Sequence, residues 1–562
     1  MQQRKQSGID ADEAERIGAD AARPTLGGLA ARGRQRLAAG RQLAELARYA
    51  GAPLIVGTAL TNLAIGAAPV GFLVGIGLAL QRLASGAPPG GWLWLALGAF
   101  VLQQVLALVQ FLLSMEIGRR VDTACITRFT SFALRRAPLR VLERPDVADR
   151  LGEADEAFEQ WTYTPGGAVE AALALLPHYT RLLGAVLVIG VAAGPGPALA
   201  GLAVALVART GQTEAFYRWG QLIRGFRGLR RRAAYLRELS TSTRAAKEIR
   251  TLGLAGWLDD RFHRETRAVL DPMWRWRRRV YGMPFVGYSV VALAGTVVAL
   301  VLVGRSGGVG DVGRVAMAVQ GIVLCARFGV MFPEADVKLV YGRSAWEALL
   351  EFEAIATDAT AGEAGPAGDG SRVTPRSTIA LDGVRFGYRP EQPVLEGLSL
   401  ELAVGTSTAL VGVNGAGKTT LVKLLAGLYR PDAGTVRVDG TDLRELDPDG
   451  WLRAFAITFQ DYLRYELPLR DNVAMGSIEH RDDDAGILAE LARVGLGDLV
   501  GQLPAGLDTP LTRSLPGGRE LSGGQWQRLA LARSLFAVRH GASVLVLDEP
   551  TAQLDARGED EF

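Results

Sequence analysis

Residues 412–419 read GVNGAGKT, residues 521–525 read LSGGQ, and residues 544–550 read VLVLDEP. The first run fits the pattern G-x-x-x-x-G-K-[ST], in which glycines let several backbone N–H groups point at one phosphate chain. A helix predicted directly after it, at residues 420–428, adds its N-terminal dipole to the same anion site. Lys418 is then placed to reach the β- and γ-phosphates, and the Thr419 hydroxyl to reach Mg²⁺.

The third run predicts a buried strand at residues 544–547, because it is short, continuous and apolar. The strand ends in Asp548 and Glu549, which would hold the metal and polarise a water. Each run has an ordinary alternative: the glycines could make a plain strand–helix connection, LSGGQ could be a loop followed by a helix, and Asp548 with Glu549 could be a simple helix cap. In this order within one domain-sized segment, the three runs together predict an α/β P-loop ATPase.

With these motifs, residues 379–562 resemble the nucleotide-binding domain of ATP-binding cassette (ABC) transporters. The resemblance implies that Tyr388, in VRFGYRP, stacks on adenine, and that Gln460, in ITFQD, contacts Mg²⁺ and couples to a membrane domain. It implies that Glu549 is the catalytic base and that residues 551–555, TAQLD, form the D-loop.

The resemblance also implies a nucleotide site shared between two subunits. One subunit supplies the P-loop and the other the LSGGQ signature, which binds the γ-phosphate. The expected nucleotide contacts are Tyr388, Gly412, Val413, Asn414, Gly415, Ala416, Gly417, Lys418, Thr419, Thr420, Gln460, Ser522, Gly523, Gly524 and Gln525. The expected Mg²⁺ ligands are Thr419, Gln460 and Asp548, and the expected cofactors are therefore ATP and Mg²⁺.

The C-terminus departs from the family pattern. The family carries a switch histidine roughly thirty residues past the Walker B aspartate, which is Asp548 here, and the chain stops at Phe562. His480 and His540 both precede Asp548 and cannot take that role. We therefore expect an ATPase domain that is C-terminally truncated.

Composition bounds the remaining classes. A chain of 562 residues implies at least two domains, and 49% hydrophobic residues leave one half very apolar. The net charge of +3 argues against a nucleic-acid partner. Two cysteines, Cys125 and Cys325, are too few for a disulfide framework or a Cys-rich metal site.

Several stretches are free of acidic and basic residues for the roughly 20 residues that a membrane span needs. They are residues 49–81, 83–115, 280–304 and 315–333, the last interrupted only by Arg327. A soluble protein has no use for so many, so these stretches predict a lipid bilayer as a partner of the chain.

Residues 182–208 are the difficult case, because their length suits one helix and would give five spans. Five spans would place the Arg-rich flanks, residues 116–181 and 209–279, on opposite sides of the membrane, against the positive-inside rule. Residues 194–197 read GPGP, a turn signal. The sequence therefore predicts two helices here and six spans in all.

Six spans match the α-helical membrane domain of exporter-type ABC proteins. The expected organisation is a cytoplasmic tail with an interfacial helix at 1–48, a transmembrane domain at 49–357, a linker at 358–377 and the ATP-binding domain at 378–562. The resemblance places coupling helices near residues 137–150 and 239–246.

The predicted protein is a half-transporter that pairs with a second half-transporter, as a homodimer or a heterodimer, in the plasma membrane with its N-terminus and ATPase domain cytoplasmic. The layout favours ATP-driven export of a drug, lipid or peptide. Two alternatives stay open: an importer, for example of a siderophore, and a soluble ABC ATPase without transport.

Arg327 interrupts the sixth span far from its outer end, where a charge facing lipid is costly. We expect it to face the bundle or a watery cavity. His178 and Arg181 lie three residues apart, on one face of the third helix. Arg327 either pairs with a carbonyl or a buried acid, or receives an anionic part of the substrate together with Arg181.

Overall fold

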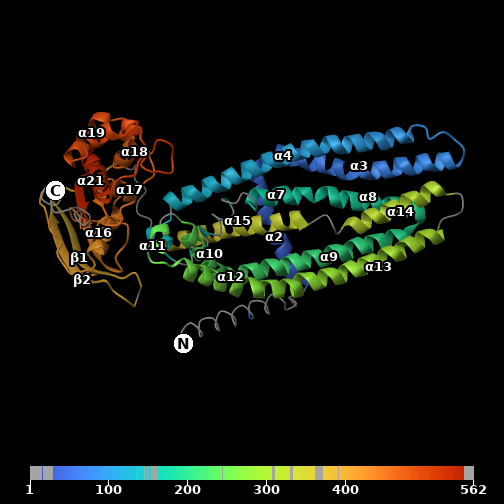
Figure 1. The fold of residues 1–562 in the computed structure, drawn as a ribbon, viewed down its shortest axis with the longest axis horizontal. Coiled ribbons are helices and arrows are strands. Elements are labelled where there is room, and N and C mark those ends of the chain that lie inside the picture. The colour runs from blue at the N-terminus through green and yellow to red at the C-terminus, as the bar shows by residue number, and fades with distance from the viewer. Residues whose placement is uncertain are drawn as a thin grey trace. The chain divides into compact units, whose positions relative to one another are not determined.

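The computed structural model describes residues 16, 29–135, 137–144, 147, 151–152, 158, 163–242, 245–306, 311–328, 333–360, 371–389 and 391–549. The chain divides into two compact units. One comprises residues 1–136 and 145–354, and the other comprises residues 137–144 and 355–562. Figure 1 shows long helices in the first unit, and strands with shorter helices in the second.

The first unit is entirely helical in the residues described. Its elements are α2 (Leu29–Ala50), α3 (Ala52–Ala84), α4 (Trp92–Arg135), α7 (Pro165–Ala174), α8 (Leu176–Ala193), α9 (Pro195–Gly225), α10 (Arg227–Thr241), α11 (Ala246–Thr251), α12 (Ala255–Arg277), the π-helical turn η1 (Arg278–Gly282), α13 (Met283–Ser306), α14 (Val312–Arg327) and α15 (Pro333–Thr360). Helix α3 packs along α4, α9 along α13, and α14 against both α3 and α8 (Figure 1).

Four stretches of helix in the described part of the chain are long and apolar enough to cross a membrane. They are Ala52–Ala84, Trp92–Arg135, Pro165–Ala193 and Phe285–Arg305. Helices α9 and α14 do not reach that measure, although both pack against the spanning helices. The number of six spans therefore stays a prediction.

The turn predicted at residues 194–197 is present. Gly194 ends α8 with φ 90°, and α9 begins at Pro195. The left-handed conformation is open to glycine without a Cβ penalty, and proline is tolerated at the first helical position because its missing N–H has no partner there. Residues 182–208 therefore fold as two helices that pack on each other.

Glycines bring α3 and α14 into backbone contact. A Cβ placed on Gly313 would lie 2.2 Å from the carbonyl oxygen of Gly77, and one placed on Gly77 would lie 2.0 Å from Cγ of Met317. Close approach of this kind is how helices gain packing energy where lipid supplies no hydrophobic drive. Near the C-terminal end of α4, Arg128 binds Glu353 of α15 at 2.6 Å and joins the two helices.

The second unit carries two small sheets. The first has the order β2-β1-β3-β4 and is antiparallel, built from β1 (Thr378–Phe386), β2 (Leu395–Ala403), β3 (Ala433–Val438) and β4 (Thr441–Asp442). The second pairs β5 (Phe455–Thr458) with β6 (Val544–Leu547) in parallel. The strand predicted at residues 544–547 is thus confirmed, but it is only partly buried, because Leu545 is exposed.

Helices surround these sheets in two hydrophobic clusters. One packs α16 (Lys418–Leu425) and α17 (Pro448–Leu452) against the antiparallel sheet, around the buried ring of Trp451. The other joins α18 (Leu469–Ala474), α19 (Asp484–Arg493), α20 (Leu499–Gln502) and α21 (Gly523–Arg539), around Trp526 and Phe536. Helix α5 (Leu139–Leu142) belongs to this unit by its contacts.

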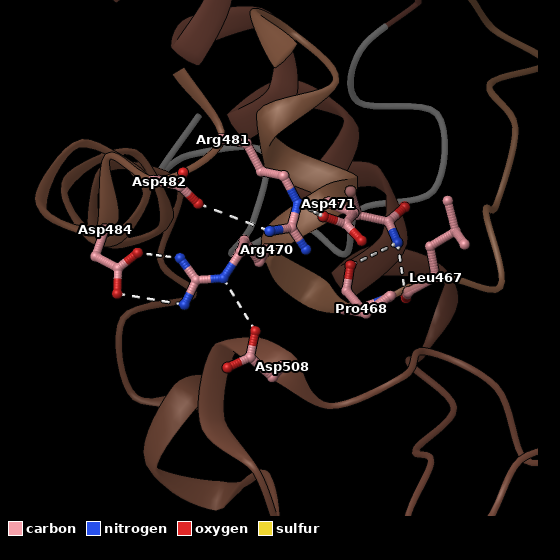
Figure 2. A network of polar contacts seen from close by, with 9 residues as sticks. Leu467, Pro468, Arg470, Asp471, Arg481, Asp482, Asp484 and Asp508 are labelled. Carbon is pink, nitrogen blue, oxygen red and sulfur yellow. Dashed lines mark hydrogen bonds and ion pairs between the residues drawn. The ribbon is translucent and has the colours of Figure 1, made fainter. Parts of the chain in front are cut away.

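An ion-pair network ties the second cluster together on its polar side (Figure 2). Arg470 of α18 binds Asp484, the first residue of α19, and reaches Asp508 at 3.0 Å. Arg481 binds Asp471, also of α18, at 2.5 Å. Because Arg470 holds two carboxylates on separate segments, it fixes the orientation of α18 relative to α19.

Residues at both ends of the segment expected as a linker, 358–377, belong to ordered elements, and residues 361–370 lie outside the described residues. Helix α15 runs to Thr360, and residues 371–377 lie against the ATPase domain. The N–H of Val373 donates to the carbonyl of Gly450 at 3.0 Å. Asp439 accepts from the Ser377 hydroxyl at 2.7 Å, and this bond with those from neighbouring backbone N–H groups holds the pKa of Asp439 well below its ordinary value.

Candidate nucleotide site

The P-loop turns sharply in front of α16. Gly415 and Gly417 have φ of 82° and 90°, and α16 begins at Lys418. The Lys418 ammonium donates to the carbonyl oxygens of Gly412 and Val413, at 2.9 and 3.4 Å. The lysine charge therefore lies over the loop, directly before a helix N-terminus that favours anions.

Oxygen ligands suited to a hard cation meet beside this loop. The Thr419 hydroxyl donates to Oδ2 of Asp548 at 2.7 Å, although 129 residues separate the two in the chain. Asp548 is buried at the end of β6, where its N–H donates to the carbonyl of Thr458 at 2.9 Å. A hydroxyl and a carboxylate are ligands that Mg²⁺ prefers beside substrate phosphates, so these residues fit the expected metal.

The expected base lies at the same sheet edge. Gln460 Nε2 donates to Glu549 Oε2 at 2.7 Å. Glu549 has φ 50°, a left-handed conformation that costs energy for a residue with a side chain. The structure thus brings together the P-loop, Thr419 with Asp548, and Gln460 with Glu549, as the sequence predicts.

Tyr388 contacts two residues of α16. Its hydroxyl is 3.2 Å from that of Thr420, and its ring stands edge-on to Tyr429 with 5.5 Å between centroids. Lys423 lies 5.6 Å from the Tyr388 ring centroid. The Tyr388 side chain is 44% exposed, so part of the ring is free to stack on a base.

The signature segment forms a helix start. The Ser522 hydroxyl accepts from the N–H of Gln525 at 3.3 Å, and the Gln525 side chain accepts from the N–H of Ser522 at 2.9 Å. This capping box begins α21, with Gly523 and Gly524 in its first turn. Among the described residues no hydrogen bond links the signature to the P-loop.

Comparison with known proteins agrees with this geometry. The family model described as "ABC transporter" matches residues 395–552. The subtilin transport ATP-binding protein SpaT of Bacillus subtilis is 25% identical over 456 residues, which are 80% of this chain and 70% of SpaT. Residues 395–552 therefore form an ABC ATPase domain, and the chain resembles ABC half-transporters of the exporter type.

One further relative and one solved structure are also similar to this chain. The mycobactin import ATP-binding/permease protein IrtB of Mycolicibacterium thermoresistibile is 42% identical over 182 residues, 32% of this chain and 30% of IrtB. A solved structure of a bacterial Atm1-family ABC exporter with ATP bound superimposes with a TM-score of 0.67 at 21% identity, covering 91% of this chain and 87% of that one. That likeness establishes the fold.

Among the described residues, no group of three His, Cys, Asp or Glu side chains converges. The D-loop expected at residues 551–555 lies outside the described residues.

The contacts that join the α5 segment to the residues around Tyr388 were not predicted from the sequence. The Tyr429 hydroxyl donates to Glu143, and Lys423 Nζ lies 3.6 Å from the same carboxylate. Burial together with Glu143 raises the pKa of Tyr429. Because Tyr429 and Lys423 also contact the Tyr388 ring, Glu143 is connected to the expected adenine site. The first coupling helix was expected here, at residues 137–150, but these pairings have no sequence signal.

The second coupling helix was expected near residues 239–246, of which 243 and 244 lie outside the described residues. Helix α10 ends at Thr241 and the short helix α11 spans Ala246–Thr251, and the coupling role stays a prediction.

Proposed function

We propose that this half-transporter exports its substrate across the plasma membrane as a dimer, with its N-terminus and ATPase domain in the cytoplasm. The exporter fold extends over 91% of the chain, and this observation carries the proposal. The alignment with SpaT runs over 80% of the chain, so it includes the membrane domain. A peptide, drug or lipid therefore stands as the substrate class.

In this proposal each ATP lies between residues 412–419 of one subunit and residues 522–525 of the other. Two anion-binding helix starts, those of α16 and α21, then meet one nucleotide. A single chain holds one half of each site, so dimerisation is required. A homodimer suffices because the described chain carries both halves, and a heterodimer uses the same surfaces.

Glu549 is proposed as the base, because its carboxylate follows Asp548 at the strand end and is oriented by Gln460. Its Oε2 would exchange the Gln460 amide for a water and take up that water's proton. Mg²⁺, held by Thr419, Asp548 and Gln460, would neutralise phosphate charge when bound. Binding of two nucleotides closes the ATPase domains, and hydrolysis reopens them.

Import is a second candidate, favoured by one observation: the ATPase domain is 42% identical to that of a mycobactin import protein. Direction of transport separates the two. ATP is added to the solution outside everted vesicles that contain the protein, which is the side that the ATPase domains face in this proposal. Uptake of a fluorescent peptide into the vesicles is then recorded. Export predicts accumulation that disappears in Glu549→Gln. ATP-dependent release from preloaded everted vesicles would contradict export and support import.

The soluble ABC ATPase is disfavoured by the four apolar helices. Extraction decides it: the protein should stay with membranes under high salt and carbonate, and appear in solution only with detergent.

A further inference from the structure

Three basic side chains line one small cavity inside the helical unit. The cavity measures about 80 Å³ and lies between α8 and α14. Its basic lining residues are His178, Arg181 and Arg327, and its apolar ones are Leu182, Leu324 and Phe328. The sequence points to the same three residues: His178 and Arg181 through their helical spacing, and Arg327 because it interrupts the predicted sixth span.

Both arginines lie deep along their helices. Arg181 is twelve residues from the end of α8 at Ala193, and Arg327 is fifteen from the start of α14 at Val312. At 1.5 Å per residue these positions are about 18 and 22 Å from the outer helix ends. A guanidinium at such depth is costly, unless it faces the bundle interior and finds an anionic or polar partner.

The described residues supply no such partner for either arginine. Neither Arg181 nor Arg327 makes an ion pair there, and Nε of Arg181 is buried without a hydrogen-bond partner. The two guanidinium groups act on each other as like charges. Arg327 is exposed in the single chain.

The carboxylate of Asp336 already has a basic partner in the helical unit. Asp336 of α15 is buried and accepts from Nη2 of Arg209 at 2.8 Å. Arg209 also reaches the hydroxyl of Tyr179, the residue next to His178, at 3.5 Å. Asp336 therefore balances Arg209, and the positive charge at the cavity stays uncompensated.

We propose that this cavity binds the anionic head group of a substrate, a carboxylate or a phosphate, between Arg181 and Arg327. A cavity of about 80 Å³ exceeds the roughly 10–15 Å³ that one water needs by the same measure, so it has room for a small head group. Leu182, Leu324 and Phe328 give the adjoining apolar contact. The site thus selects amphipathic acids, and the inference rests on the proposed transport function.

The same chemistry has two sources, a transported acid and an anionic lipid. The test uses full-length protein in phosphatidylcholine nanodiscs and a matched pair of probes, octanoate and the neutral octanamide. Octanoate is expected to raise the melting temperature and to stimulate the ATPase, and octanamide to do neither. Arg181→Gln and Arg327→Gln should each weaken the octanoate response by about tenfold or more in concentration, since each removes a charge-assisted bond.

Two control variants make the result specific. Arg314→Gln alters an arginine on the same helix, at its outer end beside Asp311, and should keep the octanoate response. Arg327→Lys retains a positive charge and should keep part of it. Without ligand, Arg181→Gln and Arg327→Gln should melt no lower than the parent protein, because an unpaired like charge has been removed.

Equal effects of octanoate and octanamide would overturn the inference, and so would an octanoate response that survives in both glutamine variants. A lower melting temperature or failure to fold in either variant would assign a structural role and overturn it as well. Basal ATPase activity is measured in the same samples: if it persists without any octanoate effect, only the cavity inference fails. Nanodiscs with phosphatidylglycerol separate the sources, because loss of the octanoate response there identifies a lipid head group as the occupant.

Discussion

Gly417→Ala should weaken ATP binding strongly, because Gly417 has both a left-handed backbone and little room. Its φ is 90°, a conformation that costs a residue with a Cβ roughly 1–2 kcal/mol. The added Cβ would also lie 2.9 Å from Cδ2 of Leu395 and 3.1 Å from Cγ1 of Val394. Overpacking of this kind typically costs about 1–3 kcal/mol. The loop conformation therefore loses about 2–5 kcal/mol, and ATP affinity falls at least about 30-fold.

Two neighbouring glycines separate strain from crowding. Gly415 has φ 82° with nothing within 4 Å of an added Cβ, so Gly415→Ala tests strain alone, and a loss of about 5–30-fold is expected. Gly412 is not in the left-handed region, and its added Cβ would meet only Cβ of Ala416 at 3.4 Å. Gly412→Ala should change affinity by less than about threefold.

The assay is equilibrium binding of a fluorescent ATP analogue, with Mg²⁺, to the full chain in detergent. The expected order of affinity is the parent protein and Gly412→Ala, then Gly415→Ala, then Gly417→Ala. The reasoning fails if Gly417→Ala binds as tightly as the parent protein, or if Gly412→Ala is the weakest of the three.

Glu549→Gln should lower ATPase turnover by about 10²–10⁴-fold and keep nucleotide affinity, since a general base typically contributes that much; undiminished steady-state turnover would exclude Glu549 as the base. Removal of Mg²⁺ with EDTA should abolish turnover, and restored activity on adding Mg²⁺ back is the control. Burial, and then repulsion by the charge of the neighbouring His480, lower the pKa of His540. The unfolded state therefore binds more protons, and the stability should fall as the pH drops below about 6.5; melting curves from pH 8 to 5 should show a smaller fall for His540→Gln. Glu143→Ala should leave nucleotide affinity within a few fold and reduce substrate-stimulated ATPase relative to basal rate, and an unchanged ratio would deny α5 a coupling role.

The ATPase motifs were predictable because each lies within a few consecutive residues. A P-loop needs only its own glycines and Lys418 to be recognised, and Asp548 follows directly from the apolar run before it. That Thr419 and Asp548 would meet was expected from the family resemblance, and the 2.7 Å contact agrees with it. Nothing in the sequence pairs Tyr429 with Glu143, because the contact joins segments 286 residues apart without a shared pattern.

In the membrane half, composition located apolar stretches but not helix ends. The apolar stretch begins at Val315, but helix α14 begins at Val312 and includes Gly313 and the charged Arg314. Segment ends depend on tertiary contact: residues 371–377 read as a linker, yet the hydrogen bonds of Asp439 hold them on the ATPase domain. The strand at residues 544–547 was expected to be buried, but only β5 pairs with it among the described strands.

The glycine contacts between α3 and α14 bear on how this protein changes shape. Gly313 and Gly77 bring the two helices so close that sliding or tilting of either one would cause a collision. We therefore expect α3 and α14 to move together as one rigid body. Helices α9 and α13 form a second tight pair, in which a Cβ on Gly211 would meet the Tyr288 ring at 2.2 Å. This second pair should likewise move as one body, and Gly313→Ala should disrupt the contact between α3 and α14.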